Sequence, residues 1–304
     1  MCDVLGETFE ERSDKVQVVE LLQEGRREDY GADVPHGVGV LVSSTDTQDD
    51  RLIHAVWGYG AGEESWLIDV VELEGDPRKG DVWIVHDLTL ERVFKHRSGQ
   101  TMKIKRAVVD SAGHATDAVY KYCAARRDRG VFAIFGNRLQ QKPLVGIPSR
   151  RASNRYGAAV FPLCVDTGRA DIVSRLRIRE RGAGFVHLPK GLDDEWVKQL
   201  ASTRSVWRRS GGLLVREWTK AYHPRDHLFD LAVYGLGALR MLGPAFIQKL
   251  AGRAKKLSEV VEGAEVEALP EYGVEPEVAA APVGPRPRRQ ASAWIRAGLP
   301  PGRR

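Results

Sequence analysis

Three apolar runs close together in the first quarter of the chain constrain the fold most strongly. They cover residues 38–42, 52–59 and 65–71, and only short polar or glycine-containing segments separate them. Each run has the length of a buried strand, and connections this short join neighbouring antiparallel strands. The sequence therefore predicts a three-stranded antiparallel meander that begins just after Gly37.

After the meander the pattern changes to alternating helices and strands. We expect a helix over residues 81–95, a strand over 104–110, a helix over 116–127 and a strand over 131–135. The resulting order, β-β-β-α-β-α-β, is typical of an α/β domain with a mixed sheet that helices flank.

The later part of this region is expected to be mainly helical. Residues 137–165 read as an irregular, basic segment, and helices are expected from about residue 168 and over 193–203. A hairpin arm is expected over 211–220. The last helix, over 226–242, is apolar on nearly all sides, which predicts that it is buried.

Composition separates the N-terminal segment from this domain. We expect residues 1–36 to form a junction segment with one short helix over 15–27, and residues 37–245 to form the folded domain.

The C-terminal part, residues 246–304, contains the end of a helix and then a tail of biased composition. Residues 262–277 include six Glu and no Lys or Arg, whereas residues 285–304 include six Arg and no acidic residue. Repeated prolines interrupt any regular element, so the sequence predicts a disordered C-terminal tail.

Composition also excludes several classes of protein. The longest apolar runs are far shorter than a membrane span, and the acidic N-terminus does not resemble a secretory signal. Cys2, Cys123 and Cys164 form no CxxC pair, which argues against a disulfide framework or a thiolate zinc site and favours a reducing cytoplasm. With 46 Lys and Arg against 41 Asp and Glu, the net charge of +5 permits a polyanionic partner.

Three aspartates stand where a strand order could bring them together. Asp46 follows the run at 38–42, Asp110 ends the fourth expected strand, and Asp230 lies inside the late apolar helix. If the chain folds in the RNase H-like way, the first and fourth strands are neighbours at the centre of the sheet. Three converging carboxylates suit a hard cation such as Mg²⁺ or Mn²⁺, and two such ions can catalyse phosphodiester hydrolysis.

Each of these residues also has a simpler explanation, because a single Asp at a strand end is most often a turn or cap residue. The same holds for four auxiliary candidates near the expected site. Asp49 fits a hairpin turn, Asp226 a helix N-cap, and His114 a polar residue at a helix start, while His227 follows Asp226 at the start of the late helix.

The search for other chemistry is mostly negative. The sequence contains no GxxxxGK[ST] phosphate loop, no GxSxG and no HExxH. Basic clusters at Arg150 and Arg151, at 175–179 and at 208–209 fit contacts to a DNA backbone, although solvated faces are the commoner explanation of such clusters.

Several short motifs occur in a fixed order along the chain and together carry a family resemblance. They are STDTQDDRL (44–52), WGYGAGEESWLID (57–69), VDSAGH (109–114), VDTGR (165–169), FVHLP (185–189), VREW (215–218) and DHLFDLAVYGLGAL (226–239). In this series, over about residues 4–242, the chain resembles the nuclease half of lambda-type phage terminase large subunits.

The resemblance implies a metal-dependent, RNase H-like DNA endonuclease that cuts concatemeric viral DNA during genome packaging. Matched residue by residue, Asp46 is the first-strand metal ligand, Asp110 the fourth-strand acid and Asp230 the late-helix acid. The alternative is a catalytically inactive subunit that binds DNA or docks in a packaging complex. Two positions depart from the family pattern: Arg169 stands where the family usually has Lys, and His227 where it usually has Glu.

The resemblance also implies partners. They would be double-stranded DNA, the small terminase subunit, the portal and procapsid, and a separate terminase ATPase subunit, since the ATPase motif is not found in this sequence. The chain is then expected in the cytoplasm of the bacterial host, away from membranes, as a separately encoded nuclease subunit or a prophage remnant.

Overall fold

The computed structural model describes residues 26–31, 33–137, 143–148, 154–210, 213–220 and 225–259. Most of the helix expected over 15–27 and the tail beyond residue 259 lie outside these ranges, as do Arg150 and Arg151. None of the helices within the described residues is long and apolar enough to span a membrane.

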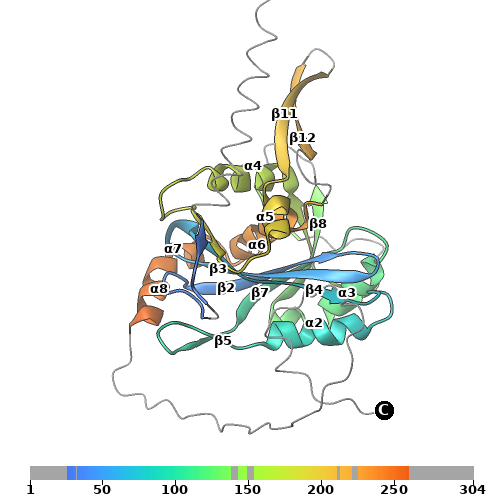
Figure 1. Ribbon diagram of the computed structural model, residues 1–304. Coiled ribbons are helices and arrows are strands. Elements are labelled where there is room, and N and C mark those ends of the chain that lie inside the picture. Colours follow the sequence, from blue (N-terminus) through green and yellow to red (C-terminus); the bar gives the residue numbers. More distant parts are fainter. Residues whose placement is uncertain are drawn as a thin grey trace, which may run out of the picture.

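The centre of the molecule is an eight-stranded mixed sheet in the order β1-β10-β4-β3-β2-β7-β8-β9 (Figure 1). Its five middle strands are β2 (Val40–Thr47), β3 (Arg51–Tyr59), β4 (Ser65–Glu74), β7 (Ile104–Asp110) and β8 (Val131–Asn137). The first three form the antiparallel meander, and β7 then pairs in parallel with β2 and with β8. The RNase H-like mixed sheet is thereby confirmed, with the first and fourth expected strands as neighbours.

The outer strands were not anticipated. Strand β9 (Val160–Cys164) lies within the stretch that was expected to be irregular, so that expectation was wrong for these five residues. Pro162 sits inside it, which an edge strand tolerates because one side of its backbone needs no ladder partner. On the opposite side, β10 (Val186–Pro189) and β1 (Arg27–Glu28) extend the sheet in parallel beyond β4.

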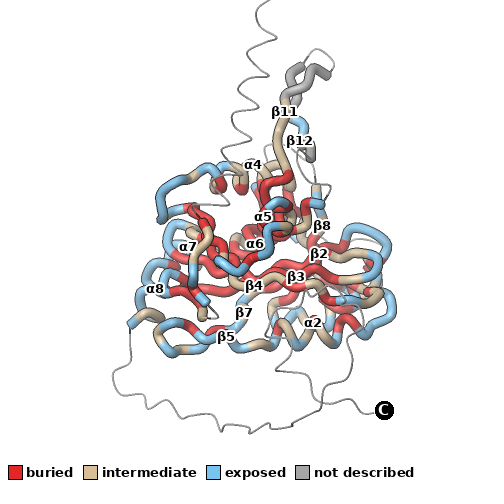
Figure 2. The backbone as a smooth tube through the Cα atoms, in the orientation of Figure 1, coloured by how far each residue is buried: buried red, intermediate tan, exposed pale blue. Residues whose placement is uncertain are grey.

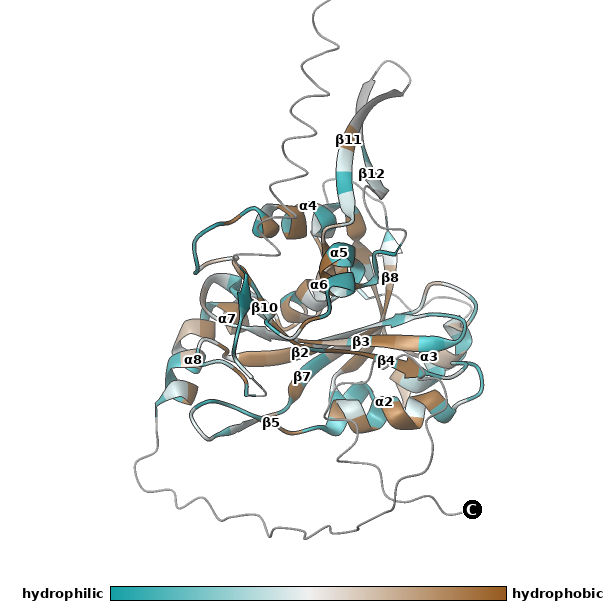
Figure 3. Cartoon of the chain, in the orientation of Figure 1, coloured by the Kyte–Doolittle hydropathy of each residue, from teal (hydrophilic) through white to brown (hydrophobic). Residues whose placement is uncertain are grey.

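Helices cover both faces of the sheet. On one face lie α2 (Asp81–Glu91) and α3 (Thr116–Ala124), and on the other lie α4 (Val165–Leu176), α5 (Asp194–Leu200) and α6 (His227–Arg240). The buried backbone in Figure 2 follows the middle strands and α6, which confirms that this apolar helix is buried. Apolar residues concentrate in the same strands and in the helices packed on them (Figure 3).

Short elements complete the fold. Two 3-10 turns, Ala61–Glu63 and Arg127–Arg129, precede β4 and β8, and α7 (Pro244–Gln248) and α8 (Leu250–Ser258) follow α6. The helix expected over 81–95 ends at Glu91, since Phe94–Lys95 forms strand β5, which pairs with β6 (Thr101–Met102). Strands β11 (Thr203–Ser210) and β12 (Leu213–Lys220) form a hairpin that projects from the body (Figure 1).

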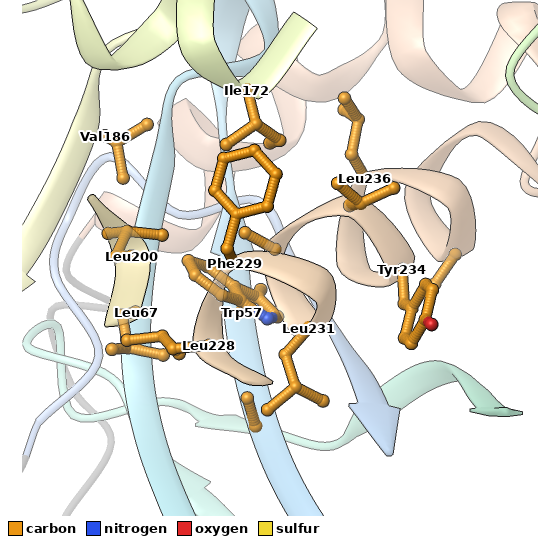
Figure 4. Close-up of a cluster of buried hydrophobic side chains, with 14 of the residues drawn as sticks. Trp57, Leu67, Ile172, Val186, Leu200, Leu228, Phe229, Leu231, Tyr234 and Leu236 are labelled. Carbon is orange, nitrogen blue, oxygen red and sulfur yellow. The ribbon is translucent and has the colours of Figure 1, made fainter. Parts of the chain in front are cut away.

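Helix α6 is held on the sheet by one close contact and by a hydrogen bond from Ser44, which Trp57 supports in turn. A Cβ added at Gly235 would lie 2.6 Å from Cδ1 of Trp57, so the helix approaches β3 as only glycine allows. Trp57 donates to Ser44 Oγ (3.2 Å), and Ser44 donates to the carbonyl of Leu231 (2.8 Å). Phe229 of α6 packs in the same buried cluster (Figure 4). These contacts fix where α6 presents its polar residues.

The segment before the first expected strand is anchored by a buried arginine. The Arg26 guanidinium donates to the carbonyls of Leu176 (2.9 Å), Val186 (3.1 Å) and Ile178, and it lies over the Phe185 ring. Leu176 is the last residue of α4, whose final carbonyls lack partners within the helix. Burial lowers the pKa of Arg26 to about 10, so the side chain stays charged and satisfies that helix end.

Candidate functional site

Two of the predicted aspartates lie next to each other at the centre of the sheet. Thr45 pairs with Val109 in the parallel register of β2 and β7, and Asp46 and Asp110 are the next residue on each strand. Asp46 lies inside β2 rather than beyond the strand, because β2 extends to Thr47. Both side chains are almost fully buried, with residue exposures of 7% and 6%.

The third aspartate comes from the helix above them. Asp230 lies in the first turn of α6, close enough that its charge, together with that of Asp46, raises the pKa of Asp110. Burial is the larger cause, and together these effects bring the pKa of Asp110 to about 7. Burial also raises the pKa of Asp230 to about 6, with Asp226 and Asp46 adding to the effect and Arg169 opposing it.

The carboxylates of this site each have a protein partner. Asp46 Oδ2 accepts from Gln48 Nε2 (2.9 Å) and from His227 Nδ1 (2.8 Å), and Asp110 Oδ1 accepts from the backbone N–H of Ala112 (3.1 Å). Asp230 Oδ1 lies 3.3 Å from an Arg169 guanidinium nitrogen. Within the described ranges, no three His, Cys, Asp or Glu side chains are arranged to hold a metal ion as they stand.

The donor chemistry of the site nevertheless fits a hard divalent cation. Its donors are carboxylate oxygens, which Mg²⁺ and Mn²⁺ prefer, and they share one buried region. A cation there would offset the burial and the repulsion that together raise the pKa values of Asp110 and Asp230.

Two residues near these carboxylates were missed by sequence reasoning. Gln48 stands two positions after Asp46, directly beyond the end of β2, and its side-chain amide reaches back to the Asp46 carboxylate. Tyr234 stands four positions after Asp230 on the same face of α6, and its phenol pKa is raised by burial and by the charges of the three aspartates. The helical spacing of four from Asp230 would have found Tyr234, and nearness to Asp46 in the sequence is the signal that points to Gln48.

The auxiliary candidates divide between the site and the surface. His227 contacts Asp46, and Asp226 is buried beside Asp230, although its side chain does not cap α6. Asp49 and His114 instead pair with each other (2.9 Å), with side chains 70% and 78% exposed.

A second polar network lies on the opposite face of β2. Thr45 Oγ1 contacts His54 Nδ1 (2.9 Å) and His86 Nε2 (2.8 Å), and His86 Nδ1 contacts the Tyr122 hydroxyl (2.7 Å), which donates to Asp87. Burial lowers the pKa of His54 to about 3 and that of His86 well below its usual range. Both rings are therefore neutral, and they contact β2 through Thr45 on the face opposite Asp46.

Comparison with known families agrees with this geometry. A family model described as the endonuclease domain of the terminase large subunit gpA matches residues 1–250. The chain belongs to this family. The match includes every described site residue, and it confirms the resemblance that the ordered motifs indicated.

Individual relatives are similar over part of their length. The chain is 30% identical over 244 residues to the terminase large subunit of Escherichia phage lambda, covering 78% of this chain and 37% of the relative. It is 27% identical over 272 residues to that of Enterobacteria phage P21, covering 84% and 40%. This terminase nuclease domain thus spans about two fifths of the length of the curated relatives it matches.

Among solved structures, the chain is similar to a mutant nuclease domain of the large terminase subunit of bacterial virus Sf6 with manganese. The TM-score is 0.39 at 11% identity, covering 73% of this chain and 96% of that one.

Proposed function

We propose that this terminase nuclease domain is a divalent-metal-dependent DNA endonuclease that cuts concatemeric viral DNA during genome packaging. The observation that carries the proposal is the convergence of Asp46, Asp110 and Asp230 from two neighbouring strands and one helix into a buried region. Two buried carboxylates and a third, partly buried one that repel each other are costly to keep unless they serve a cation.

The three aspartates would hold Mg²⁺ or Mn²⁺ as catalytic residues. When bound, two such ions supply an activated water and stabilise the leaving oxygen of a phosphodiester. Arg169 contacts Asp230, and it would orient a phosphate oxygen once the carboxylates bind a cation. Its bidentate guanidinium would take the place of the lysine that is usual in the family.

The proposed partners follow from the same function. They are double-stranded DNA, a terminase ATPase subunit, the small terminase subunit and the portal of the procapsid, in the cytoplasm of the bacterial host. Arg150 and Arg151 lie outside the described residues and stay predicted contacts to the DNA backbone, which Lys and Arg neutralise without regard to sequence.

One observation favours a second candidate, an inactive subunit that binds DNA or docks in a packaging complex. The aspartates already hold protein partners, namely Gln48 and His227 on Asp46, the Ala112 amide on Asp110, and Arg169 on Asp230. A protein that never bound metal would keep these contacts.

Plasmid cleavage separates the two candidates. With Mg²⁺ or Mn²⁺ we expect nicking and linearisation by the purified chain, no cleavage in EDTA, and at least a ~1000-fold loss in Asp46→Asn with DNA binding retained. Asp117→Asn on the exposed side of α3 is the matched control and should cut normally. Cleavage that survives Asp46→Asn would exclude the assigned site. DNA binding without any cleavage, also after an ATPase subunit is added, would favour the second candidate.

A further inference from the structure

One face of β2 meets one face of α6 through a regular set of polar contacts. Ser44 and Asp46 alternate along β2 and therefore share a face, and Gln48 follows directly after the end of the strand. Ser44 contacts Leu231 and Asp46 contacts His227, and these two partners are four residues apart on α6. The strand and the helix are thus joined at the residue that would bind metal.

The two hydrogen bonds to Asp46 reach the same oxygen. Gln48 Nε2 lies 2.9 Å and His227 Nδ1 lies 2.8 Å from Oδ2. An ionised carboxylate only accepts, so Nδ1 of His227 carries the proton in this contact. Two donors fill both lone pairs of Oδ2, and no hydrogen bond to Oδ1 is found among the described residues.

Both donors are themselves held in place. The backbone N–H of Gln48 donates to the Arg51 carbonyl (3.0 Å) and closes the turn between β2 and β3. His227 opens α6, which Ser44 and Trp57 fix on the sheet. The side chains of Asp46 and His227 are only 10% and 17% exposed, so little water competes for their bond.

We propose that Gln48 and His227 are positioning residues that hold Asp46 as a one-oxygen metal ligand and thereby favour Mg²⁺ and Mn²⁺ over Ca²⁺. This inference rests on the metal site of the proposed function. With Oδ2 occupied, Asp46 offers Oδ1 alone to a cation. Ca²⁺ gathers six to eight oxygens and often takes both oxygens of a carboxylate, whereas Mg²⁺ accepts six ligands in strict octahedral geometry.

The test is calorimetric titration of the full chain with Mn²⁺, Mg²⁺ and Ca²⁺. Gln48→Met and His227→Phe each remove a donor and preserve much of the side-chain volume. We expect either change to weaken Mn²⁺ binding by roughly 10- to 100-fold, as loss of a ligand's hydrogen-bond partner usually does. The ratio of Mg²⁺ affinity to Ca²⁺ affinity should fall in the same two variants. His227→Gln can still donate a hydrogen bond, so it should keep most of the wild-type ratio.

Three controls make the result decisive. Gln100→Met, in the loop before β6, removes a Gln amide away from the site and should bind metal like wild type. Thermal unfolding in EDTA should show that the variants are folded. If Asp46→Asn abolishes Mn²⁺ binding while Gln48→Met and His227→Phe leave both affinity and Mg²⁺/Ca²⁺ preference within twofold, the positioning role is wrong and the metal site stands.

A second measurement shows whether His227 only donates to Asp46 or binds the metal directly. Electron spin-echo spectra of the Mn²⁺-loaded chain should show no imidazole nitrogen coupling to the metal. Coupling that His227→Phe removes would make His227 a direct ligand and would overturn its assignment as a positioning residue. If Asp46→Asn binds Mn²⁺ like wild type, the metal site itself, and with it the proposed function, is wrong.

Discussion

At the scale of single residues, the ionised Asp110 carboxylate lowers the stability of the metal-free fold. Its pKa is about 7 in the fold against an ordinary 3.8, so the native state binds its proton more tightly than the unfolded chain does. Its protonated form stabilises the fold at low pH, and that contribution is lost as pH rises through about 7. Above that pH the metal-free protein keeps a buried, repelled charge.

Asp110→Asn should therefore stabilise the metal-free protein at pH 8 by on the order of 2–4 kcal/mol while abolishing cleavage. Denaturant unfolding in EDTA at pH 8 and pH 5 measures this, and the gain over wild type should shrink at pH 5. His54 and His86 have low pKa values in the fold, so they reduce stability as pH falls below about 6.5. This effect is the same in wild type and in Asp110→Asn, so it cancels when the two proteins are compared at one pH. An Asn variant less stable than wild type at pH 8 would contradict the burial and repulsion assigned to Asp110.

The residues that sequence reasoning found and missed differ in a physical way. The proximity of Asp46, Asp110 and Asp230 was predictable because charged residues at strand ends and in an apolar helix are unusual, and the strand order dictates which ends meet. Their role as metal ligands stays a prediction. Gln48 and Tyr234 are ordinary in their local sequence and gain significance only from what faces them. The role of Arg26 was equally unpredictable, because nothing in the sequence around it indicates which carbonyl groups its side chain contacts.

At the scale of elements, the contact between α6 and β3 sets the position of Asp230. Gly235→Ala places a methyl group 2.6 Å from Trp57 Cδ1, so the helix or the indole must move. We expect a loss of about 1–3 kcal/mol, as overpacking usually causes, and a fall in metal affinity because Asp230 moves with the helix. Thermal unfolding and Mn²⁺ titration measure the two effects.

Gly252→Ala is the matched control, because a Cβ on this glycine of α8 meets nothing within 4 Å. It should be neutral or slightly stabilising, since alanine favours a helix more than glycine does. If Gly235→Ala and Gly252→Ala had the same thermal stability and the same Mn²⁺ affinity, the close approach of α6 to Trp57 would not determine the position of the helix.

The middle strands and main helices were predictable from hydrophobic periodicity, whereas the edges of the sheet were not. Strands β1, β9 and β10 are two, five and four residues long, and their pairing comes from tertiary contacts rather than from an alternating pattern. The end of α2 was overestimated for a related reason: Phe94 is apolar, but it is buried in a strand rather than in the helix.

At the scale of the whole molecule, Arg26 links the segment that leads into the sheet to α4, the helix that carries Arg169. Arg26→Met should leave several buried carbonyls without a donor and cost about 2–4 kcal/mol. Arg27→Met, which loses a partly exposed pair with Asp194 and one hydrogen bond to the Leu192 carbonyl, should cost less, about 1 kcal/mol. Denaturant unfolding of both variants gives the comparison, and equal losses would refute the anchoring role of Arg26.

The proposed endonuclease requires a cation between Asp46, Asp110 and Asp230, and anomalous diffraction from crystals grown with Mn²⁺ tests this most directly. We predict anomalous peaks in contact with Asp46 Oδ1 and with oxygens of Asp110 and Asp230, with Gln48 and His227 still bound to Oδ2. Ordered carboxylates without an anomalous peak at saturating Mn²⁺, or Mn²⁺ only at the exposed Asp49–His114 pair, would contradict the account.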